Sequence, residues 1–275
     1  MEQARRYLFV GLKGLVIAAL LVWSLTPIFW NILTSFKVPG QIFDYPPVFF
    51  FMPNLDAYQQ ALGPGGIYPQ LQNSLFVAIG TTVVSLACAV LAGYAFSRYE
   101  FPGRKPLMLG LVATRLLPPI SAVVPLYLLA SDLNLIDTRT ILVVIYSALN
   151  IPFATWLLKS YVDAVPKELE ESAFLEGCGS LRTIQKITMP LIAPGLVATG
   201  IFVFILAWNE FMFAYMFTAV NARTMPVVLA EARGGEQILW QVLTAQATIL
   251  IVPAVIVGIF LQKYLVRGLT AGAVK

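Results

Sequence analysis

Arg115 and Glu210 are charged residues inside long apolar stretches of this 275-residue sequence. A charge at mid-depth of a bilayer costs roughly 3 kcal/mol on insertion scales, so it is retained mainly where it pairs, lines a pathway or contacts a ligand. Asn150 is a polar residue in a third such stretch. The chain contains no histidine, the commonest general base, so these residues indicate binding or gating rather than hydrolytic catalysis.

Arg115 lies nine residues after Pro106, which begins an apolar stretch. At about 1.5 Å per residue, Arg115 is roughly 14 Å into a span and near the midplane. Pro118 and Pro119 follow and break the helical hydrogen-bond ladder, which frees carbonyl groups beside a cavity. Three roles remain open: a pore-lining cation that binds sugar hydroxyls or an anionic group, a structural partner of Glu210, or a side chain that snorkels to the membrane surface. Pore lining is the favoured hypothesis.

Glu210 follows Trp208 and Asn209 near the end of another apolar stretch. This cluster offers either stacking and acceptors for a sugar, or contacts that hold helices together at an outer gate. The gate is slightly favoured, because transporter binding sites lie nearer the midplane. Asn150, beside Pro152 at mid-depth, needs a partner in lipid and faces either the helix bundle or the pore.

The amino-acid composition indicates that this chain lies in a lipid bilayer. Hydrophobic residues make up 59% and charged residues 12%, with a mean hydropathy of +0.80, which excludes a soluble globular enzyme. The basic balance, with 18 Lys and Arg against 14 Asp and Glu, fits cytoplasmic loops of a membrane protein better than nucleic-acid binding. Cys88 and Cys178 lie in unlike surroundings, so neither a disulfide nor a zinc site is expected. We expect no catalytic residue, metal or cofactor on this chain.

The sequence predicts an all-α integral membrane protein with one domain over residues 1–275. Uncharged or nearly uncharged runs of about 20 residues are long enough to cross a bilayer as helices. The first run follows a basic leader but lacks a cleavage signal, so it is interpreted as a retained anchor. The predicted spans are approximately 15–33, 74–96, 106–130, 140–158, 191–217 and 239–261.

Lys and Arg residues are distributed unequally between the connecting segments. They concentrate before the first span and after the second, fourth and sixth, whereas the alternate connections hold few. Because basic residues remain on the cytoplasmic side, both termini are predicted to be cytoplasmic. The long segment 159–189 then lies in the cytoplasm.

Segment 159–189 is predicted to fold as two helices. Pro166 suits the first helical position, and Glu168, Glu170 and Glu171 follow in the first turns. The first helix should stop at Gly177. A second helix over 181–188, capped by Ser180, should end before Pro190 begins the fifth span. The residues alone leave two interpretations open: a helical clip that docks into another protein, or an amphipathic loop lying on the membrane.

The spacing in this segment resembles a known family. Glu171-Ser172-Ala173, three residues, Gly177, nine residues and Ile187-Thr188-Met189-Pro190 resemble the E-A-A-x3-G-x9-I-x-L-P loop of permease subunits of binding-protein-dependent ABC importers. Ser172 and Met189 replace the usual Ala and Leu. Further similarity to maltose-type carbohydrate permeases extends over nearly the whole chain from Leu15: Asn73-Ser74-Leu75, Gly93-Tyr94-Ala95-Phe96-Ser97-Arg98, Phe101-Pro102-Gly103, Trp208-Asn209-Glu210-Phe211 and 268–275.

The resemblance implies a type I ABC importer permease fold in a bacterial or archaeal inner membrane. Implied partners are a second homologous permease, two ATPase subunits that bind ATP and Mg, an extracytoplasmic solute-binding protein and membrane lipid. The cargo would be a disaccharide, oligosaccharide, polyol or derivatised sugar. A phosphate-binding loop is not found in this sequence, so ATP hydrolysis is assigned to the partners. The implied coupling residues are Glu171 for polar contacts, Ala173 and Phe174 for close apolar contacts and Gly177 for the turn, together with Ser172, Ile187 and Pro190.

Two other classes of function are alternatives: a secondary transporter and a membrane-embedded enzyme. An ion-coupled secondary transporter would use Glu210 as a proton carrier, and its uptake would follow a proton gradient instead of ATP. A membrane-embedded enzyme would use Arg115 and Glu210, but the sequence lacks histidine and any nucleophile with a nearby base. Neither alternative explains the spaced glycine and proline of segment 159–189.

Overall fold

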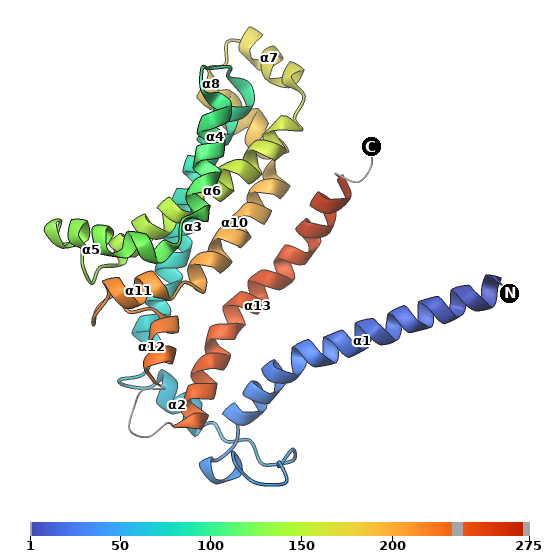
Figure 1. Ribbon diagram of the computed structural model, residues 1–275, viewed down its shortest axis with the longest axis vertical. Helices are drawn as coiled ribbons and strands as arrows, with labels where there is room; N and C mark the ends of the chain where they lie inside the picture. The colour runs from blue at the N-terminus through green and yellow to red at the C-terminus, as the bar shows by residue number, and fades with distance from the viewer. Residues whose placement is uncertain (1, 233–238, 272–275) are drawn as a thin grey trace. The chain divides into compact units, whose positions relative to one another are not determined.

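The computed structural model describes residues 2–232 and 239–271, and every regular element in these ranges is a helix. The chain forms two compact units, Met1–Tyr68 with Leu229–Ile251, and Pro69–Val228 with Val252–Lys275. Positions 272–275 at the end of the family-like tail, and Arg233, lie outside the described residues. Figure 1 shows the helices in chain order.

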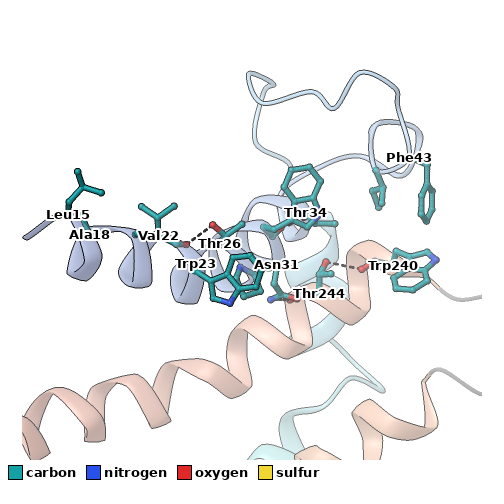
Figure 2. A pocket seen from close by; sticks show the side chains of 14 residues that line it. Leu15, Ala18, Val22, Trp23, Thr26, Asn31, Thr34, Phe43, Trp240 and Thr244 are labelled. Atoms are coloured by element: carbon teal, nitrogen blue, oxygen red, sulfur yellow. Dashed lines mark hydrogen bonds between the residues drawn. The ribbon is translucent and has the colours of Figure 1, made fainter. Parts of the chain in front are cut away.

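The first unit contains α1 (Glu2–Ser35), the 3-10 turn η1 (Pro39–Gln41), α2 (Asp56–Leu62) and the beginning of α13 (Trp240–Ala271). Small residues of α2 pack on α13, with Ala57 and Ala61 buried against Val242 and Ala245. Asn31 of α1 donates a hydrogen bond to Thr248 Oγ1 at 3.0 Å. An apolar groove of about 1270 Å³ runs along α1 in this unit, as Figure 2 shows.

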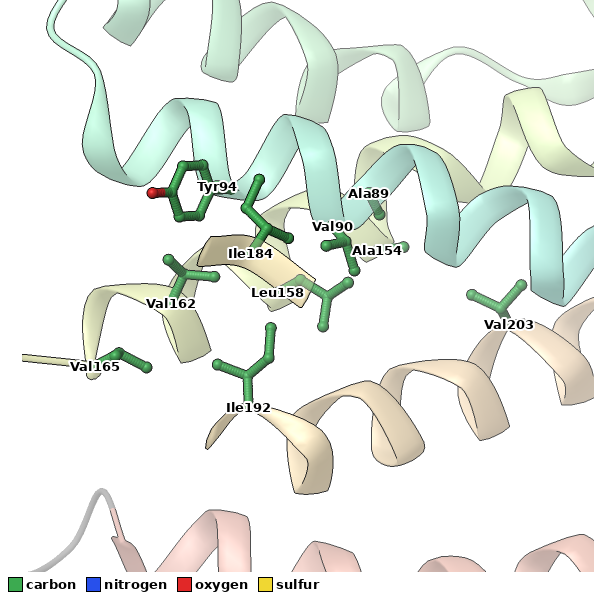
Figure 3. Packing of buried hydrophobic residues seen from close by; sticks show 10 residues of the cluster. All are labelled: Ala89, Val90, Tyr94, Ala154, Leu158, Val162, Val165, Ile184, Ile192 and Val203. Carbon is green, nitrogen blue, oxygen red and sulfur yellow. The ribbon is translucent and has the colours of Figure 1, made fainter. Parts of the chain in front are cut away.

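The second unit is built around α3 (Tyr68–Arg98), α6 (Arg139–Asp163) and α10 (Ala193–Trp208). Branched side chains such as Val90, Leu158 and Val203, one from each helix, form a buried cluster (Figure 3). Gly93 lets α3 approach α6 closely, because a Cβ there would lie 3.1 Å from the backbone nitrogen of Lys159. This cluster is the scaffold that positions the polar residues of the second unit.

Four helical segments are long and apolar enough to cross a membrane: Gly11–Ser35, Tyr68–Arg98, Arg139–Asp163 and Trp240–Phe260. Two bent helix pairs raise the number in the described residues to six if each pair is one span. The structure therefore supports between four and six candidate spans.

The predicted third span, 106–130, is interrupted where the sequence predicts a break, at Pro118 and Pro119. It divides into α4 (Arg104–Ala113), η2 (Thr114–Leu116), η3 (Pro119–Ala122) and α5 (Val123–Asp132), with a bend of 96° between the two halves. The break lies at Pro118 and Pro119, where the missing N–H groups interrupt the helical ladder.

The predicted fifth span, 191–217, is likewise not a single helix. It contains the end of α9 (Met189–Leu191), α10 and α11 (Met212–Phe217), and the chain bends by 84° between Ser180–Leu191 and α10. Pro194 lies in the first turn of α10, where its fixed φ suits a helix start. A final short helix, α12 (Met225–Glu231), follows.

Segment 159–189 contains α7 (Lys167–Leu175) and α8 (Ser180–Thr183), followed by the π-helical turn η4 (Ile184–Thr188). The prediction of one helix over 181–188 was wrong in detail. Pro190 cannot donate a backbone hydrogen bond to the preceding turn, which accounts for the wider turn before it. Figure 1 shows α7 and α8 together at one end of the helices of this unit.

Candidate coupling loop and translocation residues

Gly177, where the sequence predicts that the helix stops, follows the end of α7 and adopts the left-handed conformation with φ of 84°. The Gly177 N–H donates to Phe174 O at 3.0 Å, and the Cys178 N–H donates to Ala173 O at 2.9 Å. These two bonds form a Schellman motif, which satisfies the last carbonyls of the helix and requires a residue that tolerates positive φ. These bonds fix the turn between α7 and α8.

α7 has two chemically different faces. Glu170 and Ala173 are buried, at 2% and 4% exposed, because residues three apart share one helix face. Glu171 and Ser172 are exposed on the other side, with Phe174 43% and Leu175 90% exposed. Ala173, which the resemblance assigns to close apolar contacts, packs inward in this structure, and the outward apolar residues are Phe174 and Leu175.

Glu170, which the sequence analysis did not select, is the inward anchor of α7. Arg98 Nε at the end of α3 donates to Glu170 Oε2 at 2.6 Å, and both side chains are nearly inaccessible. Thr188 Oγ1 donates to Glu170 Oε1 at 2.8 Å, and the Tyr94 hydroxyl donates to Oε2 at 3.4 Å. One carboxylate thus joins α3, α7 and η4.

Arg98 also binds the end of α6. Its Nη2 donates to Val162 O at 3.0 Å and to Val165 O at 2.8 Å. These carbonyls lie in the last turn of α6 and just after it, at the end of the helix where cations are favoured. The ion pair therefore fastens α7 to two long helices at once. No sequence period relates Arg98 to Glu170, which are 72 positions apart, so the sequence alone did not predict this contact.

Arg115 lies in η2, at the bend between α4 and α5. Its Nη2 donates to Asn150 Oδ1 at 3.0 Å, and its guanidinium carbon lies 5.8 Å from the centre of the Phe153 ring. Asn150 in turn donates to Tyr146 O at 2.8 Å, which fixes the orientation of the amide. The structure brings Arg115 and Asn150 together, and no hydrogen bond or ion pair joins Arg115 to Glu210 in the described residues.

Glu210 instead caps the short helix α11. It accepts hydrogen bonds from the backbone nitrogens of Phe213 at 3.0 Å and Ala214 at 3.2 Å. Trp208 is 1% exposed and stacks on Phe204, whereas Asn209 is exposed and its amide donates to Ile205 O. The three neighbours predicted as a cluster therefore point in different directions, and Trp208 presents no free face for a sugar in this conformation.

Asp137 orders the chain before α12. It accepts hydrogen bonds from the backbone nitrogens of residues 219–222, at 2.9 to 3.2 Å. Partial burial alone would raise the pKa of Asp137, but these N–H donors lower it to about 2. Nearby, Asn73 donates to Asn221 O and Arg223 O and accepts from Arg139. Asn73 belongs to a motif of the resemblance, whereas Asp137 lies in none of the motifs and was not predicted.

The described residues contain no group of three or more His, Cys, Asp or Glu side chains that could hold a metal ion. The candidate site residues instead form a loop held by the Arg98–Glu170 ion pair and a bent helix with Arg115 at its break. Together with the long apolar helices, both features are typical of a membrane transport protein.

Comparison with known proteins agrees with this class. Residues 85–271 match the family described as binding-protein-dependent transport system inner membrane component, and the chain belongs to it. This confirms the resemblance identified in the sequence. The family consists of transporter permease components, and the chain is a multi-pass inner-membrane protein.

Relatives with similar sequences match over almost their full length. The chain is 36% identical to the trehalose/maltose transport system permease protein MalG of Thermococcus litoralis, over 95% of this chain and 96% of the relative. It is 33% identical to the sulfoquinovosyl glycerol transport system permease protein SmoH of Agrobacterium fabrum, over 96% and 93%.

A solved structure supports the fold. The crystal structure of a bacterial ABC transporter involved in import of the acidic polysaccharide alginate matches with a TM-score of 0.79 and 22% identity, covering 94% of this chain and 96% of that chain. The agreement over the whole length shows that the helical arrangement is that of an ABC importer permease.

Proposed function

We propose that this chain is a permease subunit of an ATP-driven ABC importer for a sugar or sugar-like solute. The observation that carries the proposal is the two-sided α7: its inner face is held by the Arg98–Glu170 ion pair and its outer face exposes Phe174 and Leu175. An exposed apolar surface on a rigid support is suited to protein docking. The permease names of the relatives support the transport class.

Segment 159–189 is the coupling loop of the proposed complex. The side chains of Glu171, Phe174 and Leu175 would enter a groove on an ATPase subunit, and Gly177 would maintain the turn between α7 and α8. Ser172 donates to Glu168 O within the helix and Ile187 is half-buried, so both shape the loop from within. Pro190 begins the following helical segment. ATP-driven movement of the ATPase pair would displace this loop.

The proposed topology has six spans with both termini and the coupling loop in the cytoplasm. The two bent helix pairs supply the third and fifth spans, and the uneven distribution of Lys and Arg supports the orientation. A second homologous permease completes the pore. Two ATPase subunits bind ATP and Mg, and an extracytoplasmic binding protein delivers the solute.

Arg115 and Asn150 are the strongest candidates for the solute pathway. A helix broken near mid-depth leaves backbone carbonyls free, and transporters use such breaks to form binding sites. The guanidinium has unused donors that suit sugar hydroxyls or an anionic substituent. Asn209 and Glu210 lie farther along the chain, and Glu210 contributes by capping α11 at the proposed gate, with Trp208 packed behind it.

The proposed function is tested by reconstituting this chain with its second permease, ATPase subunits and binding protein in proteoliposomes. We expect uptake of a labelled disaccharide, oligosaccharide or polyol that needs internal ATP and ignores an imposed proton gradient. Uptake by the chain alone, driven by a proton gradient, would overturn the proposal. The proton-coupled alternative has little structural support, because both carboxylate oxygens of Glu210 accept backbone hydrogen bonds.

A further inference from the structure

The Glu170 carboxylate is bonded from both ends of the coupling loop. Glu170 itself lies in α7 at the beginning of the loop, and Thr188, 18 residues later, donates to Oε1 at 2.8 Å from its end. Arg98 of α3 donates to Oε2 at 2.6 Å and to Oε1 at 3.3 Å. The outward face with Glu171 and Phe174 lies between these two attachment points. The buried Glu170 carboxylate therefore joins the beginning of the loop to its end.

Burial strengthens the contacts that hold the two ends of the loop together. Glu170 is 2% exposed, Thr188 1% exposed, and the Arg98 side chain 9% exposed. Water cannot readily replace a lost partner at this depth, so removing one member of the pair leaves the other charge buried and uncompensated. The base of the loop consequently opens less easily than an exposed salt bridge would.

Arg98 links this base to the helices that cross the membrane. It belongs to α3 and donates to the carbonyls of Val162 and Val165 at the end of α6. The neighbouring Ser97 donates to Asp163 Oδ1 at 2.6 Å, which adds a second tie between the ends of α3 and α6. A force applied to α7 therefore reaches two helices through one guanidinium.

We propose that Glu170 is the positioning residue that converts movement of the coupling loop into movement of α3 and α6. This inference rests on the proposed function. Glu171 faces outward toward the ATPase subunit, whereas Glu170 faces inward and keeps both ends of the loop on Arg98. Without the anion, the loop flexes on its own base and ATP hydrolysis no longer moves the helices.

The test measures solute molecules imported per ATP hydrolysed in the reconstituted complex. Glu170→Gln removes the charge with little change in volume, and Glu168→Gln is the matched control because its side chain is exposed on the same helix. We expect Glu170→Gln to retain ATP hydrolysis while the import ratio falls about tenfold or more, because the buried guanidinium loses the charged partner that holds the loop to α3 and α6. Glu168→Gln should match the unsubstituted complex.

A milder variant covers the case in which Glu170→Gln fails to assemble. Thr188→Val preserves the side-chain shape and the Arg98–Glu170 pair but releases the end of the loop from the carboxylate. We expect an intermediate import ratio in a complex that assembles and hydrolyses ATP normally, a combination that a purely structural role would not produce. A normal ratio in Thr188→Val, or in an assembled Glu170→Gln complex, would overturn the inference. Absence of ATP-driven uptake in the unsubstituted complex would instead overturn the proposed function.

Discussion

Arg115 donates a hydrogen bond to Asn150 Oδ1 at 3.0 Å, and this neutral amide takes the place of the carboxylate that an intramembrane arginine usually needs. The amide is held in orientation by its own bond to Tyr146 O. The positive charge therefore remains available at the bend between α4 and α5, which makes it testable as a solute contact.

Arg115→Gln should weaken solute capture. Glutamine retains hydrogen-bonding groups but loses the charge, and a charge-assisted hydrogen bond is worth about 1.5 to 3 kcal/mol. We expect the solute concentration for half-maximal uptake to rise about tenfold or more. Arg115→Lys should raise this concentration less than Arg115→Gln does, because lysine keeps the charge but lacks the planar guanidinium that binds with two donors. Arg104→Gln, at the other end of α4, serves as the control.

Gly177→Val should abolish uptake-coupled ATP hydrolysis while the chain still inserts into the membrane. Valine must adopt φ near 84°, which costs about 1 to 3 kcal/mol and destroys the turn between α7 and α8. Gly179→Val is the matched control, since Gly179 has φ of −77° and ψ of 162°, a conformation that suits valine. Normal uptake by Gly177→Val, measured in proteoliposomes, would contradict the coupling assignment.

Phe174→Asp should detach the ATPase subunits. Docking an exposed phenylalanine into an apolar groove contributes about 1.5 to 3 kcal/mol, and a buried unpaired aspartate would add a penalty. Affinity purification in mild detergent should recover less ATPase with this variant. Val220→Asp changes an apolar residue outside the loop that is more exposed, at 74% against 43% for Phe174, and should leave recovery unchanged.

The charge of Asp137 should stabilise the fold above about pH 4 and not below about pH 2. Its folded pKa of about 2 lies below the ordinary value of 3.8, so the folded state favours the anion, and this stabilisation is lost as the pH falls through that window. Asp137→Asn should lower the unfolding temperature at pH 7 and show a smaller change on acidification. Asparagine also tolerates the positive φ of 58°, so backbone strain does not confuse the comparison.

Apolar runs, prolines and loop spacing made much of this protein predictable. Membrane location follows from hydropathy because lipid forces every backbone polar group to bond within a helix. The positions of Gly177 and of Pro118 and Pro119 predict a turn and a break because these residues constrain φ locally. Such features depend on neighbours in the chain, so they can be deduced from the sequence alone.

Only the tertiary structure shows that Glu170 faces inward and that Arg115 contacts Asn150. It also shows that Trp208 is buried while Glu210 caps α11. Arg98 and Glu170 are 72 positions apart, and Arg115 and Asn150 are 35 apart. Glu170 and Glu171 have the same chemistry and adjacent positions, yet one is buried and the other exposed. The sequence determined which residues could form ion pairs and turns, whereas helix rotation and packing decided which of them meet, because a helix turns by about 100° per residue.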